Sequence, residues 1–215
     1  LHRRRHSFPT RRSSDLITSD YQRRLKAELG FGETTLCYAG RLGIEKNIDV
    51  LIRALPLVLR RFGSIQLVLA GHGSHQEQLR KLAAELGVER HVRFLGTLDK
   101  WNLAKVLQAS ELFVTMSTSE TQGMAMLQAM ACGLPVIGAH SRALPEFIDR
   151  ASGLTVGPDD HVGLADGIVT LLADEPRRAV LGRNAVAHAG EFATEAVADR
   201  WEVLYWRLIQ PATTP

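Results

Sequence analysis

The sequence has little cysteine, no close cluster of metal-ligating residues and no long apolar run. Its two cysteines, Cys37 and Cys132, lie in apolar surroundings, which favours reduced core thiols in a reducing compartment over a disulfide or a ligand pair. No apolar run approaches the roughly 20 residues that span a bilayer. The only His-x-x-x-His pair, His2 and His6, brackets three arginines that would repel a cation. These absences predict a globular cytoplasmic protein without a metal site.

Residues 1–16, LHRRRHSFPTRRSSDL, contain five arginines and no core-forming periodicity. Residues 6–16 resemble the translation of a sequencing-library adapter, so we expect a non-native arm outside the fold and a reading frame that begins inside a gene. The alternative is a basic disordered arm that binds nucleic acid or anionic lipid. Without its five Arg and one Asp, 21 basic and 22 acidic residues remain, and the net charge changes from +3 to −1. The sequence therefore predicts no nucleic-acid partner.

From Thr34 onward, short strand patterns rich in Val, Ile and Leu alternate with longer helical patterns. Strands are expected at residues 34–41, 64–73, 92–96, 111–117, 134–138 and 153–156. Helices are expected at 47–62, with a kink near Pro56, and at 74–87, 100–110, 123–131, 142–150, 161–174, 175–192 and 193–210. Apolar strands that are each followed by a helix predict a doubly wound parallel α/β sheet, Rossmann-like, in one domain over residues 17–215. Ligands of such sheets bind at the carboxyl ends of the strands.

Two of these strand ends carry glycine-containing turns. Residues 40–47, GRLGIEKN, place Arg41 and Lys46 around a turn that opens a helix, so both cations can reach one anionic group. The alternative is a pair of solvated charges on a loop. Residues 70–73, AGHG, form a loop where the backbone can approach a ligand closely. This loop is not a dinucleotide fingerprint, because Gln76 replaces the third glycine.

A third strand end is followed by SETQGMAMLQAMACGLP, residues 119–135. The free N–H groups of residues 123–125 form a helix N-terminus suited to a phosphate, and Gly123 lets the backbone come close to it. Glu120 lies in the loop before this helix and is expected to face a ligand; the alternative is a helix-entry acid favoured by the helix dipole. Gln128 lies over a turn into the helix, where a second carboxylate would make a matched pair.

Four segments together resemble, in order and spacing, the retaining glycosyltransferases of family 4: GRLGIEKNIDVLIRA, LVLAGHGSHQEQL, VRFLGTL and SETQGMAMLQAMACGLPVIG. The resemblance covers roughly residues 34–205. It implies the carboxyl-terminal, nucleotide-sugar-binding half of a GT-B fold, with the amino-terminal, acceptor-binding domain missing. The last expected helix, residues 193–210, would cross back toward that missing domain.

The resemblance implies a role for each matching position. Arg41 and Lys46 grip the donor diphosphate and stabilise charge on the leaving group, which is electrostatic work that needs no metal. Glu120, the first glutamate of an E-x7-E motif, contacts the donor sugar, and these three are the expected catalytic residues. The expected donor-binding residues, including the strand end beside the nucleobase, are Gly40, Gly71, Gly73, Arg93, Phe94, Leu95, Gln122, Gly123, Met124, Ala125 and Gln128.

Gln128 departs from the family pattern, in which a second glutamate holds the ribose diol. An amide has the same shape as a carboxylate and can accept one hydrogen bond while donating another. It loses charge assistance, at a cost of about 1 kcal/mol in nucleotide binding. Chemistry at the anomeric carbon should survive, because Glu120 and the two cations remain. We therefore interpret Gln128 as a tolerated variant and not as the sign of an inactive enzyme.

The remaining candidates have mainly structural interpretations. Core packing, rather than a cofactor site, is expected for Met116, Met124, Met126 and Met130. Amphipathic helix packing is expected for Trp101, Trp201 and Trp206, and Trp201 and Tyr205 are suited to contacts with the missing domain. Glu146 is expected to be structural, whereas Arg142 is a candidate to approach the acceptor.

The function expected from this resemblance is retaining transfer of a sugar from a nucleoside diphosphate sugar, without a cofactor, to an unidentified acceptor. The SETQG loop resembles that of enzymes acting on lipid or lipid-linked acceptors; a polysaccharide acceptor and peripheral association with the inner face of the membrane stay open. One alternative is a nucleotide-binding fragment without turnover, which is the expectation for this chain alone. The other is a GT-B nucleotide-sugar epimerase, whose acid and base residues are not found in the sequence.

Overall fold

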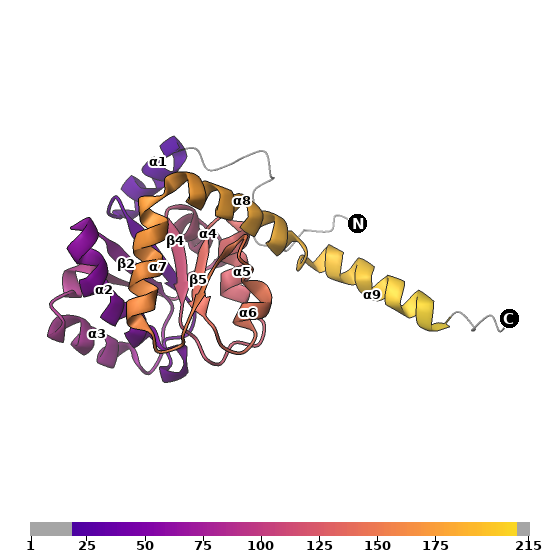
Figure 1. The fold of residues 1–215 in the computed structure, drawn as a ribbon, viewed down its shortest axis with the longest axis horizontal. Helices are drawn as coiled ribbons and strands as arrows, with labels where there is room; N and C mark the ends of the chain where they lie inside the picture. Colours follow the sequence, from indigo (N-terminus) through magenta and orange to yellow (C-terminus); the bar gives the residue numbers. More distant parts are fainter. Residues whose placement is uncertain (1–18, 210–215) are drawn as a thin grey trace.

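The computed structural model describes residues 19–209, which form a six-stranded sheet with helices packed around it (Figure 1). The strands pair in the order β3-β2-β1-β4-β5-β6, and every pairing is parallel. They are β1 Thr35–Ala39, β2 Gln66–Ala70, β3 Val92–Gly96, β4 Leu112–Thr115, β5 Val136–Ala139 and β6 Gly153–Val156. The predicted doubly wound parallel sheet is confirmed. The expectation for residues 1–16 lies outside the described residues.

Helices cover both faces of the sheet, because its central strands are apolar on both sides (Figure 1). β1, β4 and β5 are buried along their whole length. The helices are α1 Ser19–Leu29, α2 Ile48–Phe62, α3 Gln76–Glu85, α4 Lys100–Gln108, α5 Met124–Ala131, α6 Leu144–Phe147, α7 His161–Ala173, α8 Glu175–Gly190 and α9 Thr194–Ile209. Two 3-10 turns, η1 Ile44–Lys46 and η2 Glu89–His91, precede α2 and β3.

α2 shows how the apolar pattern produces a core helix. Its buried side chains recur at helical spacing and form one face, so burial of this face stabilises the helix despite Pro56, which lies inside it. The helix continues as one element from Ile48 to Phe62. That face comprises Ile48, Leu51, Ile52, Leu55 and Val58, together with Val50 and Ala54 at its margin.

Two helices differ from the prediction by more than two residues at an end. α1 is absent from it, because the polar sequence SDYQRRLKAEL buries only Leu25 and Lys26 and so carries little apolar periodicity. α6 covers four residues, where residues 142–150 were expected to be helical. Arg142 has a left-handed backbone (φ 51°) and Ile148 is extended, so the chain leaves the helical region on both sides of α6.

α1 is fastened to the amino-terminal end of the sheet by a buried ion pair. Lys26 Nζ lies 2.6 Å from Glu111 Oε1, and the two side chains are 11% and 14% exposed. The other oxygen of the carboxylate, Glu111 Oε2, accepts a 2.7 Å hydrogen bond from the Thr35 N–H at the start of β1. Burial raises the pKa of Glu111, while the Lys26 charge and these hydrogen bonds act in the opposite direction. One carboxylate therefore links α1, β1 and β4.

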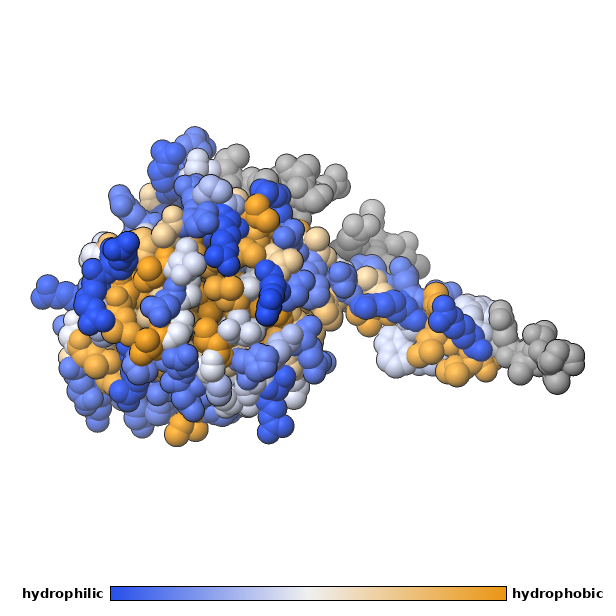
Figure 2. Space-filling model, viewed as in Figure 1, coloured by the Kyte–Doolittle hydropathy of each residue, from blue (hydrophilic) through white to orange (hydrophobic). Residues whose placement is uncertain are grey.

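α9 projects away from the rest of the chain, and none of its residues is buried (Figure 1). Apolar side chains lie at its surface beside charged ones (Figure 2). The expectation that Trp201 and Trp206 pack within the chain is therefore wrong, as it is for Trp101 on α4, because all three side chains are more than half exposed. Between residues 19 and 209, no helix is long and apolar enough to cross a membrane.

The sulfur-containing residues of the core follow the prediction with one exception. Cys37 and Cys132 are both buried, and burial raises the pKa of Cys37 to about 12, so its thiol stays protonated. Met116, Met126 and Met130 are buried, but Met124 is exposed. Met124 is the first residue of α5, where its side chain faces away from the core. Core packing is thus wrong for Met124 alone.

Candidate functional site

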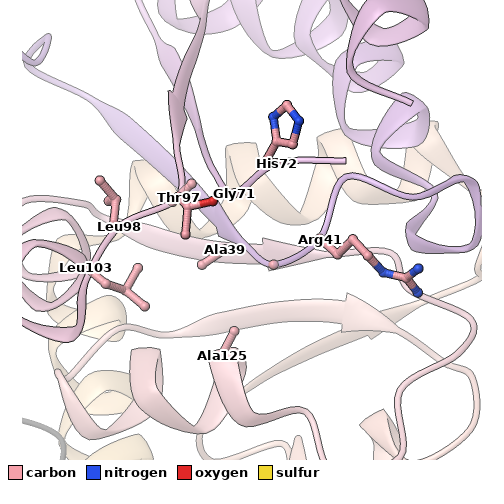
Figure 3. A pocket seen from close by; sticks show the side chains of 10 residues that line it. Ala39, Arg41, Gly71, His72, Thr97, Leu98, Leu103 and Ala125 are labelled. Atoms are coloured by element: carbon pink, nitrogen blue, oxygen red, sulfur yellow. The ribbon is translucent and has the colours of Figure 1, made fainter. Parts of the chain in front are cut away.

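A cavity of about 300 Å³ lies at the carboxyl ends of β1, β2 and β3, bounded by α4 and α5 (Figure 3). The chain passes from β1 to β2 and β3 on one side and then returns to β4 on the other side of β1. Ligands of open parallel sheets bind at such a switch point. The cavity is lined by Ala39, Gly40, Arg41, Ala70, Gly71, His72, Thr97, Leu98, Leu103 and Ala125.

The loops after β1 and β2 pack directly on each other. The Gly40 N–H donates to the Ala70 carbonyl at 2.9 Å, and the Leu42 N–H donates to the His72 carbonyl at 3.0 Å. A Cβ atom on Gly71 would lie 1.8 Å from the Gly40 carbonyl oxygen, and one on Gly73 would lie 2.3 Å from that of Leu42. These two glycines are therefore required by the contact between the loops. Gly71 lines the cavity, and Gly73 does not.

Replacing Gly71 by Ala should lower the free energy of unfolding by about 3 kcal/mol, because the new Cβ would overlap the Gly40 carbonyl and φ is +148°. Gly87→Ala is the control: φ is +67° there, but nothing lies within 4 Å of the added atom. Urea unfolding should show a loss of about 1 kcal/mol for Gly87→Ala. Equal losses for the two variants would contradict the steric explanation.

The two predicted cations occupy different places. Arg41 lines the cavity, and its guanidinium forms an ion pair with Glu45 one turn further on, with 70% of the side chain exposed. Lys46 does not line the cavity. Its Nζ lies 2.6 Å from Glu120 Oε1, 3.2 Å from Ser119 Oγ and 3.5 Å from Ser117 Oγ. Lys46 thus joins η1 to the loop between β4 and α5.

Glu120 is held beside the amino-terminal end of α5. The loop that carries it is tied to η1 a second time, because the Thr118 N–H donates to the Glu45 carbonyl at 3.2 Å. Gly123, the N-cap of α5, has a left-handed backbone (φ 58°) and provides no side-chain cap. α4, α7 and α8, by contrast, are capped by Asp side chains. The first turn of α5 therefore presents uncapped N–H groups next to Ala125, which lines the cavity.

Gln122 and Gln128 flank this helix end but do not line the cavity. Gln122 is exposed in the loop, and Gln128 is half-buried on α5. Within residues 19–209, the Gln128 amide has no hydrogen-bond partner. The position to which the resemblance assigns a ribose contact therefore lies outside the cavity lining.

Three expected donor-binding residues on β3 lie outside the cavity lining. Arg93 does not reach the cavity: its Nη1 donates to the carbonyls of Leu29 and Gly30, both at 2.8 Å, and so holds the end of α1. Phe94 is covered by the Arg80 guanidinium, 4.1 Å from the ring centroid. Neither Phe94 nor Leu95 lines the cavity. A strand alternates its side chains between two faces, so the strand end cannot present three successive side chains to one ligand.

Six lining residues are absent from the expected site residues, namely Ala39, Ala70, His72, Thr97, Leu98 and Leu103, although Ala70 and His72 belong to the predicted AGHG loop. Thr97 and Leu98 follow β3 directly, in the loop that leads to α4. Along this segment the expected site residues end at Leu95, whereas the cavity lining begins at Thr97, two residues later. Ligands of such sheets contact the loops beyond the strands, and this rule would have indicated Thr97 and Leu98.

The family of the chain is shown by comparison with known proteins. A family model described as "Glycosyl transferases group 1" matches residues 22–188. The chain belongs to this family. The match begins inside α1 and ends inside α8, so it includes the whole sheet and every residue that lines the cavity.

Curated relatives of this group 1 domain include two sugar transferases. A GDP-mannose-dependent monoacylated alpha-(1-6)-phosphatidylinositol monomannoside mannosyltransferase of Corynebacterium glutamicum is 34% identical over 185 residues, 81% of this chain and 48% of that protein. A D-inositol 3-phosphate glycosyltransferase of Corynebacterium jeikeium is 34% identical over 195 residues, 86% of this chain and 46% of that protein. The group 1 chain therefore spans about half the length of the curated relatives it matches.

Solved structures share the fold of the group 1 domain. Sucrose-phosphate synthase from Thermosynechococcus elongatus matches with a TM-score of 0.77 and 29% identity, over 86% of this chain and 48% of that one. The carboxyl-terminal domain of the group 1 family protein LpcC from Francisella tularensis has a TM-score of 0.73 and 21% identity, over 83% of this chain and 95% of that one. At 21% identity the likeness concerns the fold alone, and it extends over almost the whole of that domain.

Proposed function

We propose that this chain is the donor-binding domain of a family 4-like, retaining glycosyltransferase that uses a nucleoside diphosphate sugar without a metal. The observation that carries the proposal is the cavity at the switch point, which is lined by Arg41 and adjoins the uncapped start of α5. Both features favour an anion. A diphosphate is an anion that can contact both.

The similar proteins support a nucleoside diphosphate as the ligand. One curated relative is named as GDP-mannose-dependent, and the HepE protein of Anabaena, at 24% identity with a TM-score of 0.77, was crystallised with UDP. In this chain the diphosphate would draw Arg41 away from Glu45. The Leu98 and Leu103 side chains, with Thr97, would then offer an apolar surface with one hydroxyl to the base.

The transfer step would rely on charge and position. In the proposal Glu120, which is paired with Lys46, would contact the donor sugar, and the two cations would stabilise charge on the leaving diphosphate. The diphosphate would leave from, and the acceptor would attack, the same face of the anomeric carbon, which gives retention. The chain's own groups supply this stabilisation in the proposal, so no metal is needed.

In the proposal the acceptor is bound by a part of the protein that lies outside this chain. In the proposal the apolar side chains of α9, Trp201 and Tyr205 among them, pack against an amino-terminal acceptor domain. A lipid or lipid-linked acceptor is favoured by the name of the Corynebacterium glutamicum relative, whose stated acceptor is a phosphatidylinositol mannoside. Such an acceptor would place the enzyme in the cytoplasm, peripherally at the inner face of the membrane.

A second function applies to the chain as it is: nucleotide binding without turnover. The observation that favours it is the coverage, since the chain spans only about half of the length of its curated relatives. Turnover assays on this chain and on the full-length gene product would separate the two functions.

Calorimetry with UDP, GDP and ADP on the full chain tests the proposed donor site. One nucleotide should bind selectively. Arg41→Ala should weaken its binding roughly tenfold. Gln128→Glu should tighten its binding about fivefold, because a carboxylate regains charge-assisted hydrogen bonds to the ribose. Arg53→Ala is the matched control, since Arg53 forms the same kind of i,i+4 pair with Asp49 on α2. It should leave the affinity unchanged.

Absence of binding by a folded chain would contradict the proposed donor site. Binding that Arg41→Ala leaves unchanged would show that the nucleotide lies elsewhere. A Gln128→Glu variant without tighter binding would mean that position 128 does not contact the ribose.

A further inference from the structure

The phenol of Tyr38 lies directly beneath the cavity loop. Tyr38 is the fourth residue of β1 and is 2% exposed, although it lies two residues before the cavity residue Gly40. A Cβ atom built on Gly40 would lie 2.9 Å from Tyr38 Oη, so the end of the ring packs against the Gly40 backbone. From this position the Tyr38 hydroxyl donates to the Arg41 carbonyl oxygen at 3.0 Å.

This hydrogen bond completes the anchoring of three successive residues. Gly40 and Leu42 are held through their N–H groups by the loop after β2, at 2.9 and 3.0 Å. Arg41 lies between them, and its carbonyl is held by Tyr38. Arg41 lines the cavity from this anchored backbone, and among residues 19–209 its exposed guanidinium pairs with Glu45.

The surroundings keep the hydroxyl in its donor form. Burial is the main cause that raises the pKa of Tyr38, and the nearby carboxylates of Glu120 and Glu45 raise it further, against the lowering effect of Arg41. The phenol therefore carries its proton at neutral pH and can donate to a carbonyl oxygen, which is an acceptor only.

We propose that Tyr38 is a positioning residue for the donor: its hydroxyl fixes the Arg41 backbone so that the guanidinium is presented to the diphosphate in one orientation. The inference rests on the proposed function, because it assigns Arg41 to the diphosphate. A backbone that is fixed before binding lowers the conformational entropy that the loop carrying Arg41 loses on binding. The Tyr38 hydroxyl should then affect the affinity only when the Arg41 side chain is present.

A double-mutant cycle on the full chain tests this coupling by calorimetry with UDP and GDP. Tyr38→Phe keeps the ring in the core and should lower the affinity for the nucleotide that binds by about fivefold. In the Arg41→Ala background, Tyr38→Phe should change the affinity less than twofold, because the group it positions is gone. Tyr21→Phe is the matched control: its hydroxyl hydrogen bond to Gln108, at 3.3 Å, lies outside the cavity lining.

The outcomes distinguish this inference from the proposed function. Equal losses in both backgrounds would overturn the inference, since Tyr38 would then act on folding or loop packing alone. No loss from Tyr38→Phe, with binding still weakened by Arg41→Ala, would overturn it and leave the donor site intact. If the wild-type chain binds neither nucleotide, the proposed donor site fails, and the inference fails with it. Melting curves for each variant confirm that the chains compared are folded.

Discussion

Lys46→Ala should weaken nucleoside diphosphate binding roughly 100-fold, more than any other single change in the proposed site. The Lys46 ammonium lies 2.6 Å from Glu120, and the two side chains are only 13% and 25% exposed. Removal of Lys46 takes away one cation and also leaves the Glu120 carboxylate without its partner, where it would repel the diphosphate. Titration calorimetry with the nucleotide selected by the wild-type chain measures the loss.

A second substitution separates these two effects. Lys46→Ala combined with Glu120→Gln should recover about tenfold of the lost affinity, because the repelling charge is removed while the cation stays absent. Lys100→Ala, which changes the net charge equally at the start of α4, should bind as the wild type does. Wild-type affinity in Lys46→Ala would show that Lys46 only joins the two loops and takes no part in binding the donor.

Glu111→Ala should lower the free energy of unfolding by about 4 kcal/mol, measured by urea denaturation. The substitution leaves the buried Lys26 ammonium without its carboxylate and deprives the Thr35 N–H of its acceptor. Both groups are enclosed at the amino-terminal end of the sheet, so water does not readily replace the lost partner.

Removal of both charges should cost less than removal of one. Lys26→Met combined with Glu111→Gln leaves no buried charge, and the Gln oxygen can still accept from the Thr35 N–H. The exposed Lys105–Glu28 pair is the control: its side chains are 42% and 55% exposed, so Lys105→Ala should leave the urea midpoint unchanged. A Glu111→Ala variant as stable as the wild type would show that water hydrates Lys26 and the pair behaves as a surface pair.

The alternation of apolar strands and amphipathic helices was sufficient to predict the sheet. The strands at residues 92–96 and 153–156 have the predicted bounds, and α2 differs from its prediction by one residue. Parallel strands buried on both faces leave this signal because their side chains meet the core on either side. α1 carried no such signal, since its attachment depends on the polar contact between Lys26 and Glu111.

The sequence by itself determined which residues follow the strand ends, and with them Arg41, Gly71 and Ala125 as neighbours at one edge of the sheet. Only the tertiary structure decided that Arg41 lines the cavity while Lys46 joins Glu120, and that Arg93 holds the end of α1. Residue order and spacing specify the position along a strand or loop at which a side chain is attached. Its direction and partner depend on contacts between segments far apart in the chain, 74 positions in the case of Lys46 and Glu120.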